Sequence, residues 1–211
     1  MLSIQNNQFK PLYLNDKHHS MENIITSIRQ ILLENKDEQT RLTGLRFFKE
    51  PVNIYGLKSA FVTKLAKEQF KKIKDQPKAT VFALCEELWQ SGYMEESFIA
   101  CNWAYAMRKS FEPGDFSVFE RWVDQYVRNW ASCDTLCNHT IGTFIEMYPQ
   151  HLANLKEWAH SNNLWKRRAA AVSLIVPAKK GLFIPEVFEI ATTLLMDRED
   201  LVQKGMAGCS K

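Results

Sequence analysis

Apolar residues recur along most of the chain at the three- and four-residue spacing of amphipathic helices, and the alternation typical of strands is nowhere sustained. The first such stripes comprise Ile24, Ile25, Ile28, Ile31 and Leu32, and then Leu42, Leu45, Phe47 and Phe48. Helix-breaking residues separate the segments, at Pro51, Gly56, Pro77, Gly92, Pro113, Gly114 and Pro149. The pattern therefore predicts an all-α protein made of helices of about two to four turns.

The predicted helices fall into pairs that repeat along the chain. The first helices of four successive pairs cover 79–90, 116–129, 151–160 and 185–196, and the second helices cover 97–108, 133–148, 165–175 and the segment from Leu201 onward. A spacing of roughly 30 to 40 residues is typical of stacked helical repeats. We expect an α-α superhelix, a curved right-handed solenoid of HEAT-like or armadillo-like repeats.

The two ends of the chain depart from this pattern. Residues 1–20 mix Asn, Gln, Lys and His without periodicity, so we expect a flexible N-terminal leader there and a folded repeat domain over 21–211. A further helix pattern begins at Leu201 but stops at Ala207 and Gly208. Because a solenoid without its capping helix exposes an apolar face, this ending is typical of a domain truncated at its C-terminus.

Composition and charge narrow the picture only slightly. The net charge of +3 at pH 7 permits a polyanionic partner without requiring one. No apolar run approaches the roughly 20 residues of a membrane span, and the N-terminus lacks the apolar core of a signal peptide. The five cysteines are odd in number and mostly embedded in helical patterns, which indicates reduced thiols. We expect a cytoplasmic protein without membrane contact.

One stretch, residues 129–139, concentrates polar and aromatic side chains between two predicted helices. With Ser132 as the N-cap, Asp134 lies in the first turn, where the helix dipole favours an ionised carboxylate. An anion beside the indole face of Trp130 suits the stabilisation of a cationic sugar. A dipole-stabilising aspartate and a packing tryptophan explain the same residues without chemistry, and this pattern does not decide between the two interpretations.

Three adjacent cations, Lys166, Arg167 and Arg168, begin a helix that otherwise holds small apolar residues. Cations are disfavoured at a helix N-terminus unless they reach solvent or a phosphate. Adjacent helical residues point about 100° apart, so Arg167 and Arg168 cannot face the same groove. We expect one to be a functional contact and the other a surface or packing charge, with a purely solvated face as the alternative.

A metal site is the third candidate, formed by Cys133, Cys137 and His139. The two cysteines share a helix face, but the histidine projects elsewhere and a fourth ligand is missing. We therefore expect two core thiols and no metal.

Three stretches, in this order, resemble the AlkD-type alkylpurine DNA glycosylases of the HEAT-like DNA alkylation repair family. They are NWASCDTLCNHTIG, with Trp130 four residues before Asp134; NLWKRRAAAVSLI, which contains Arg168; and LVQKG, which begins at Leu201. Weaker support comes from the turn at 54–57 and from the helix end at 86–89. The similarity spans about residues 21–206.

The resemblance implies a DNA glycosylase that hydrolyses the N-glycosidic bond of cationic N3- or N7-alkylated purines in duplex DNA, without cofactor or metal. It implies that Asp134 stabilises the oxocarbenium-like sugar, that Trp130 packs on the lesion nucleotide, and that Arg168 grips the adjacent phosphate. Accessory phosphate contacts would be Lys166, Arg167 and Lys204. It also implies a monomer, engaging one lesion at a time, and association with the nucleoid if the source is prokaryotic.

One departure from the family pattern bears on activity. Members usually continue after LVQKG with a Gly-Trp pair and further helices, whereas Gly208 stands here at the position of that tryptophan. The alternative to an active enzyme is therefore a non-catalytic helical-repeat module that binds DNA or protein. A metal-dependent nuclease or phosphatase is not supported, since carboxylates and histidines do not cluster at ligand spacing.

Overall fold

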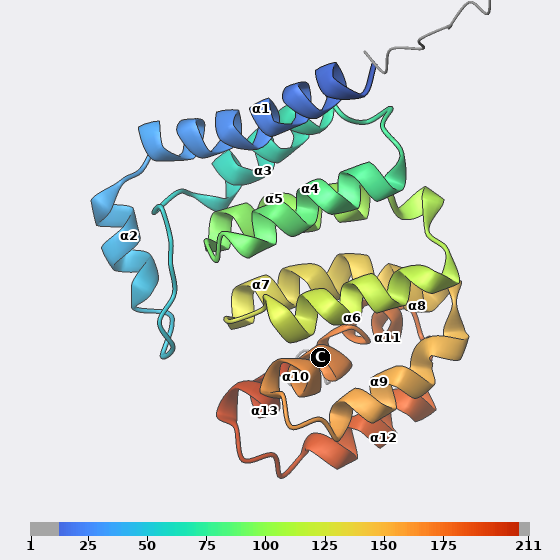
Figure 1. Ribbon diagram of the computed structural model, residues 1–211. Helices are drawn as coiled ribbons and strands as arrows, with labels where there is room; N and C mark the ends of the chain where they lie inside the picture. Colours follow the sequence, from blue (N-terminus) through green and yellow to red (C-terminus); the bar gives the residue numbers. More distant parts are fainter. Residues whose placement is uncertain (1–12, 207–211) are drawn as a thin grey trace, which may run out of the picture.

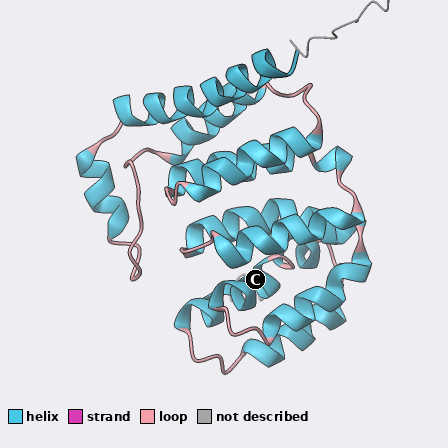
Figure 2. Cartoon of the chain, in the orientation of Figure 1, coloured by secondary structure: helices cyan, strands magenta, loops and turns pink. Residues whose placement is uncertain are grey.

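The computed structural model describes the backbone of residues 13–206 and the side chains of residues 24–205. Helices joined by short turns make up this part of the chain (Figures 1 and 2). The first half contains α1 (Tyr13–Glu34), α2 (Glu38–Leu45), α3 (Ser59–Phe70), α4 (Lys78–Gln90), α5 (Met94–Ala106) and α6 (Phe116–Gln125). The second half contains α7 (Trp130–Thr135), the π-helical turn η3 (Leu136–Ile141), α8 (Gly142–Met147), α9 (Leu152–Ala159), α10 (Leu164–Val172), α11 (Ile175–Lys179), α12 (Ile184–Leu194) and α13 (Asp200–Met206).

The helices stack as paired layers that curve into a superhelix. In Figure 1 the layers run from α1 and α3 at the top to α12 and α13 at the bottom. The second helices of successive pairs pack on one another, α3 on α5, α5 on α7, α7 on α10 and α10 on α13. Within residues 13–206 no β-strand forms, although an isolated bridge pairs Asn53 with Tyr93. The predicted all-α superhelix of helical repeats is confirmed.

A continuous apolar core fills the space between the layers. It includes an aromatic cluster between α4 and α6, in which Phe82 meets Trp122 edge to face and both rings contact Phe119 at tilted angles. Trp103 of α5 is fully buried, and its indole N–H donates to the Ala66 carbonyl oxygen at 2.9 Å. Each such buried aromatic side chain stabilises the fold by about 1.5–3 kcal/mol, so these contacts fix the spacing between layers.

Two boundaries differ from the prediction. Helix α1 begins at Tyr13, so residues 13–20 extend it, because no Gly or Pro interrupts residues 13–34. Residues 1–12 lie outside the described part. Helix α2 ends at Leu45, which places Phe47 and Phe48 in the following loop with Phe47 largely exposed. The predicted truncation rests on residues 207–211, which also lie outside the described part.

None of the described helices is both long enough and apolar enough to cross a bilayer.

Candidate functional site

Helix α7 begins at Trp130, and its N-cap is Asn129. The Asn129 side-chain oxygen accepts a hydrogen bond from the Ser132 backbone N–H at 2.8 Å. The prediction that Ser132 caps this helix is therefore wrong; its buried hydroxyl instead lies 2.7 Å from that of Ser97. Asp134 consequently lies in the second turn, beyond the free amide groups that were expected to stabilise its charge.

The partner of Asp134 is Arg168, on α10. The guanidinium donates from Nε to Asp134 Oδ1 at 2.8 Å and from Nη2 to Oδ2 at 2.7 Å. The Arg168 side chain is 6% exposed and that of Asp134 is 27% exposed. Burial opposes the charge on Arg168, but the hydrogen bonds and charge of Asp134 outweigh it and raise the pKa of the guanidinium above its usual value. Both oxygens of Asp134 are thus held in one fixed arrangement.

Helix α13, which carries the LVQKG sequence, packs directly against this pair. The third guanidinium nitrogen of Arg168, Nη1, donates to the Leu201 carbonyl oxygen. A Cβ added at Gly205 would lie only 3.3 Å from Cγ of Arg168, so the absence of a side chain there permits the close approach of α13 to α10. The last repeat therefore completes the surroundings of Arg168.

A cavity of about 280 Å³ lies in front of Arg168. Its other lining residues are Phe47, Lys49, Glu50, Trp130, Leu201 and Lys204. The loop between α2 and α3 closes one side, because Trp130 stacks on Phe48 with ring centroids 5.4 Å apart and donates its indole N–H to the Phe47 carbonyl oxygen at 3.3 Å. Lys49 pairs with Asp200 at 3.1 Å across the cavity rim. The first and last parts of the superhelix therefore meet at this cavity.

The same loop is anchored by two buried glutamates at the start of α5. The Glu95 carboxylate accepts hydrogen bonds from the backbone N–H groups of Tyr55, Gly56 and Leu57 at 2.9–3.2 Å. Glu96 accepts from the Tyr55 hydroxyl at 2.8 Å, and burial together with this bond raises the pKa of that phenol. Gly56 has φ of 86°, and a Cβ there would lie 2.3 Å from the Asp37 carbonyl oxygen, so the turn requires glycine.

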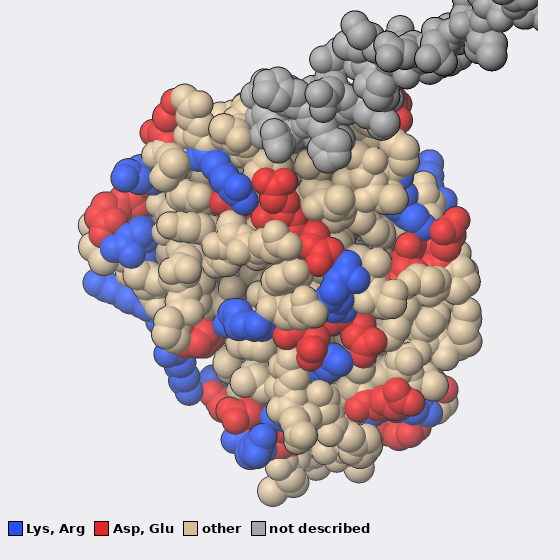
Figure 3. Space-filling view, in the orientation of Figure 1, with Lys and Arg blue, Asp and Glu red and all other residues tan. Residues whose placement is uncertain are grey.

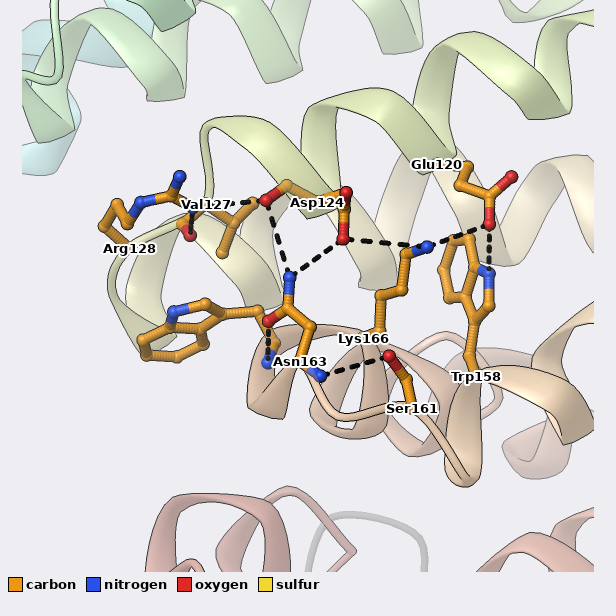
Figure 4. Close-up of polar contacts among 9 residues, drawn as sticks. Glu120, Asp124, Val127, Arg128, Trp158, Ser161, Asn163 and Lys166 are labelled. Atoms are coloured by element: carbon orange, nitrogen blue, oxygen red, sulfur yellow. Dashed lines mark hydrogen bonds and ion pairs between the residues drawn. The ribbon is translucent and has the colours of Figure 1, made fainter.

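Lys166 contacts carboxylates of α6 instead of the cavity. Its ammonium lies 3.1 Å from Glu120 and 3.6 Å from Asp124, as Figure 4 shows. Trp158 donates its indole N–H to the same Glu120 carboxylate, and Asn163 donates its side-chain amide to Asp124. This network fixes the turn before α10 on α6.

Arg167 is buried in a third direction. It forms a bidentate pair with Asp197 at 2.6 and 3.1 Å and donates to the carbonyl oxygens of Ser161 and Asn162. Its side chain is 8% exposed. Three adjacent cations on α10 therefore meet carboxylates in three directions, as an angle of about 100° between neighbours requires. A DNA contact by Lys166 or Arg167 stays a prediction, and each would have to leave its carboxylate to make one.

The cysteine pair considered as a metal site lies in the core. Cys133 and Cys137 are fully buried, and the hydrogen bond between them, together with burial, raises the pKa of the Cys133 thiol well above its usual value. Over the described residues, no group of three His, Cys, Asp or Glu side chains is arranged to hold a metal ion. Buried thiols of this kind are inert packing groups.

A family model described as DNA alkylation repair enzyme matches residues 28–209. The chain belongs to the DNA alkylation repair enzyme family. The match confirms the resemblance drawn from the three sequence stretches, and it connects the chain with DNA repair and with DNA as the substrate. A search of curated proteins found no match.

In this member of the family, the fold brings together four of the six predicted site residues. Trp130, Arg168 and Lys204 line the cavity, and Asp134, which is not among its lining residues, binds Arg168. Lys204 is exposed and pairs at 2.8 Å with Asp200. The arrangement combines a carboxylate, an indole and two cations at the meeting point of α7, α10 and α13.

The sequence reading missed the contribution of the α2–α3 loop. Glu50 and the Phe47–Phe48 pair reach the cavity from residues more than 80 positions before Asp134 in the chain. The sequence signal for this contribution was the position of Glu50 between Phe47–Phe48 and Pro51. These residues come just before the turn at 54–57, which the glutamates of α5 hold.

Proposed function

We propose that the protein is a DNA glycosylase that hydrolyses the N-glycosidic bond of cationic N3- or N7-alkylated purines in duplex DNA. The observation that carries this proposal is the cavity at which Trp130, Arg168 and Lys204 meet, with Asp134 bound behind Arg168. Membership of the DNA alkylation repair enzyme family supports the same reading.

The chemistry requires little beyond charge stabilisation. Alkylation makes the base cationic and hence a good leaving group, so a general acid is unnecessary. Positive charge then develops on the sugar, where a carboxylate stabilises the transition state more than the ground state. Asp134 supplies that carboxylate, and the electron-rich face of Trp130 packs against the lesion nucleotide.

Arg168 couples DNA binding to the exposure of Asp134. A guanidinium binds a phosphate with the same fork geometry that it uses for a carboxylate. When a backbone phosphate beside the lesion accepts hydrogen bonds from Arg168, the oxygens of Asp134 become available to the sugar. Lys204, on the rim of the same cavity, adds a second phosphate contact.

The dimensions and charges around the cavity suit a lesion that is exposed by distortion of the backbone. A volume of about 280 Å³ lies at the lower end for ligand pockets and offers no deep chamber for a whole flipped nucleotide. On the face drawn in Figure 3, Lys and Arg alternate with Asp and Glu without a large patch of one sign. This face therefore offers DNA no broad basic surface.

A binding module without catalysis is the second candidate function. It is favoured by the exposed apolar side chains on and after α12, where Phe188 is 68% and Met196 is 87% exposed. Such side chains are typical of a surface that a protein partner or further chain covers. In that case the carboxylate of Asp134 would have no part in the function.

Release of free methylated bases from methylated duplex DNA distinguishes the two candidates. We expect the wild type to release them and Asp134→Asn to lose release by about 100-fold or more, since a carboxylate aimed at developing charge is worth this much. Asp124→Asn is the matched control. It removes a carboxylate of α6 that pairs outside the cavity with Lys166, a cation of α10 like Arg168. Equal release by wild type and Asp134→Asn would contradict the proposal.

A further inference from the structure

We propose that Glu50 is a second catalytic carboxylate, which accepts the proton of the attacking water while Asp134 stabilises the sugar cation. This role rests on the proposed glycosylase function and extends it. It assigns chemistry to the α2–α3 loop, which the three family-like sequence stretches do not include.

The observation behind the proposal is the state of the Glu50 carboxylate. Both of its oxygens are buried, and neither has a hydrogen-bond partner. Glu50 is also the acidic member of the set of described residues that line the cavity. By contrast, both oxygens of Asp134 accept hydrogen bonds from Arg168. Among the described residues that line the cavity, Glu50 is therefore the one whose carboxylate is unpaired.

A buried carboxylate without a partner is unfavourable for folding. Desolvation of such a group is compensated only when a hydrogen bond or an opposite charge replaces the lost water. A buried polar group without a partner requires an explanation in a native structure, and a catalytic role is one such explanation. We infer that the partner of Glu50 is a reactant, which enters the cavity together with the DNA.

The loop holds Glu50 in place from both sides. Before it, the Phe47 carbonyl oxygen accepts from Trp130 and Lys49 pairs with Asp200. After it, Pro51 restricts the backbone and the Glu95 carboxylate binds the turn at 55–57. A base must be held within hydrogen-bond reach of the proton that it removes, and these anchors fix the position of the loop.

The proposed step balances as a hydrolysis. The bond between C1′ of the sugar and the purine nitrogen breaks, and its electron pair stays on the base, which leaves neutral. The water oxygen forms a bond to C1′, and one water proton moves to a carboxylate oxygen of Glu50. The products are the free alkylated base, an abasic sugar with a 1′-hydroxyl, and protonated Glu50, which returns the proton to solvent.

The two carboxylates take different roles because their surroundings differ. Asp134 is paired with the Arg168 guanidinium in the structure, and its carboxylate suits electrostatic stabilisation of a cation. Glu50 has no hydrogen-bond partner at either carboxylate oxygen. Pairs of carboxylates with unlike surroundings commonly divide acid–base and electrostatic work in this way.

The first test is single-turnover base release by Glu50→Gln from duplex DNA with one N7-methylated guanine, at saturating enzyme. We expect a rate about 100-fold or more below the wild type, the usual contribution of general-base catalysis, with unchanged DNA affinity. Glu38→Gln is the control, because it removes an exposed carboxylate of neighbouring helix α2 that pairs with Arg41 away from this cavity. A Glu50→Gln rate within twofold of the wild type would overturn the proposal.

The second test separates a base from a simple electrostatic role. Azide is a nucleophile that needs no deprotonation, so it should accelerate base release by Glu50→Ala and leave a 1′-azido sugar at the lesion. It should not accelerate the wild type comparably. A slow Glu50→Ala that azide does not accelerate would contradict the role of Glu50 as a base.

The unfolding temperature of Glu50→Gln reveals a loss of folding, and base release by the wild type tests the proposed function independently. Because the Glu50 oxygens have no partners, Glu50→Gln should unfold at the same or a higher temperature than the wild type. A lowered unfolding temperature would indicate a structural role and would count against the proposal. If the wild type itself releases no base, the glycosylase function fails, and the catalytic role of Glu50 fails with it.

Discussion

Arg168 holds Asp134 by two parallel hydrogen bonds of 2.8 and 2.7 Å, and the arginine is the more deeply buried partner. The pair joins the second turn of α7 to α10, and the Leu201 carbonyl oxygen extends it to α13. Three repeats thus contribute to the position of one carboxylate. We therefore expect changes to Arg168 to affect both the stability of the fold and the rate of base release.

Replacement of Arg168 by lysine tests the geometry of this pair. Lysine keeps the charge but lacks the planar fork, so it cannot bind both oxygens of Asp134 and the Leu201 carbonyl together. We expect Arg168→Lys to lower the free energy of unfolding by about 1–3 kcal/mol and to slow base release at least about tenfold. Urea denaturation and release assays measure the two effects. An unchanged stability and rate would show that the charge is sufficient.

The Arg167–Asp197 pair predicts a dependence of stability on pH. Burial disfavours the Asp197 carboxylate, but hydrogen bonds from Arg167 and from the Glu199 backbone N–H outweigh it and lower its pKa from 3.8. The pKa of Asp197 in the folded state lies below its pKa in the unfolded state. The pair therefore stabilises the fold fully at pH values above the unfolded-state pKa. This contribution disappears as the pH falls through the lowered pKa.

Asp197→Asn should remove this contribution. It leaves Arg167 buried and without its charge partner, so the free energy of unfolding should fall by about 3 kcal/mol at pH 7. The difference from the wild type should shrink when unfolding is measured in urea at pH 3. A difference that stays constant over this range would contradict the assigned ion pair.

Lys204 predicts a change in the salt dependence of DNA binding. If it contacts one phosphate, Lys204→Ala should weaken binding to all duplexes alike and reduce the slope of log affinity against log salt by about one. The control is Lys180→Ala, which removes an exposed lysine that pairs with Glu146 and does not line the cavity. Equal slopes for wild type and Lys204→Ala would exclude the contact.

The fold could be predicted because helix periodicity is a local property. Predicted first helices such as 79–90 and 185–196 correspond to α4 and α12 within a few residues, since apolar spacing and Pro or Gly breakers both act at short range. The divergence of the Lys166, Arg167 and Arg168 side chains on α10 was also predictable in part. Neighbouring side chains on a helix point about 100° apart.

The rest depended on contacts between distant residues. The choice of Asn129 over Ser132 as the N-cap is a difference of three positions that propensity does not resolve, since both residues favour caps. Glu95 holds a loop without periodicity, and its partners lie about 40 residues away in the chain. Glu50 belongs to the same loop, whereas Trp130 and Arg168, which line the cavity with it, come 80 or more positions later. A sequence pattern cannot show which of several carboxylates remains unpaired.

The most direct test of the central claim is single-turnover release of the base from a duplex with one N7-methylated guanine, comparing wild type with Asp134→Asn at equal DNA occupancy. The proposed function predicts that the wild type leaves a free base and an abasic site, and that the variant binds the duplex equally well but releases the base about 100-fold or more slowly. An intact lesion after full occupancy by the wild type, or equal rates for the two proteins, would contradict a glycosylase centred on Asp134.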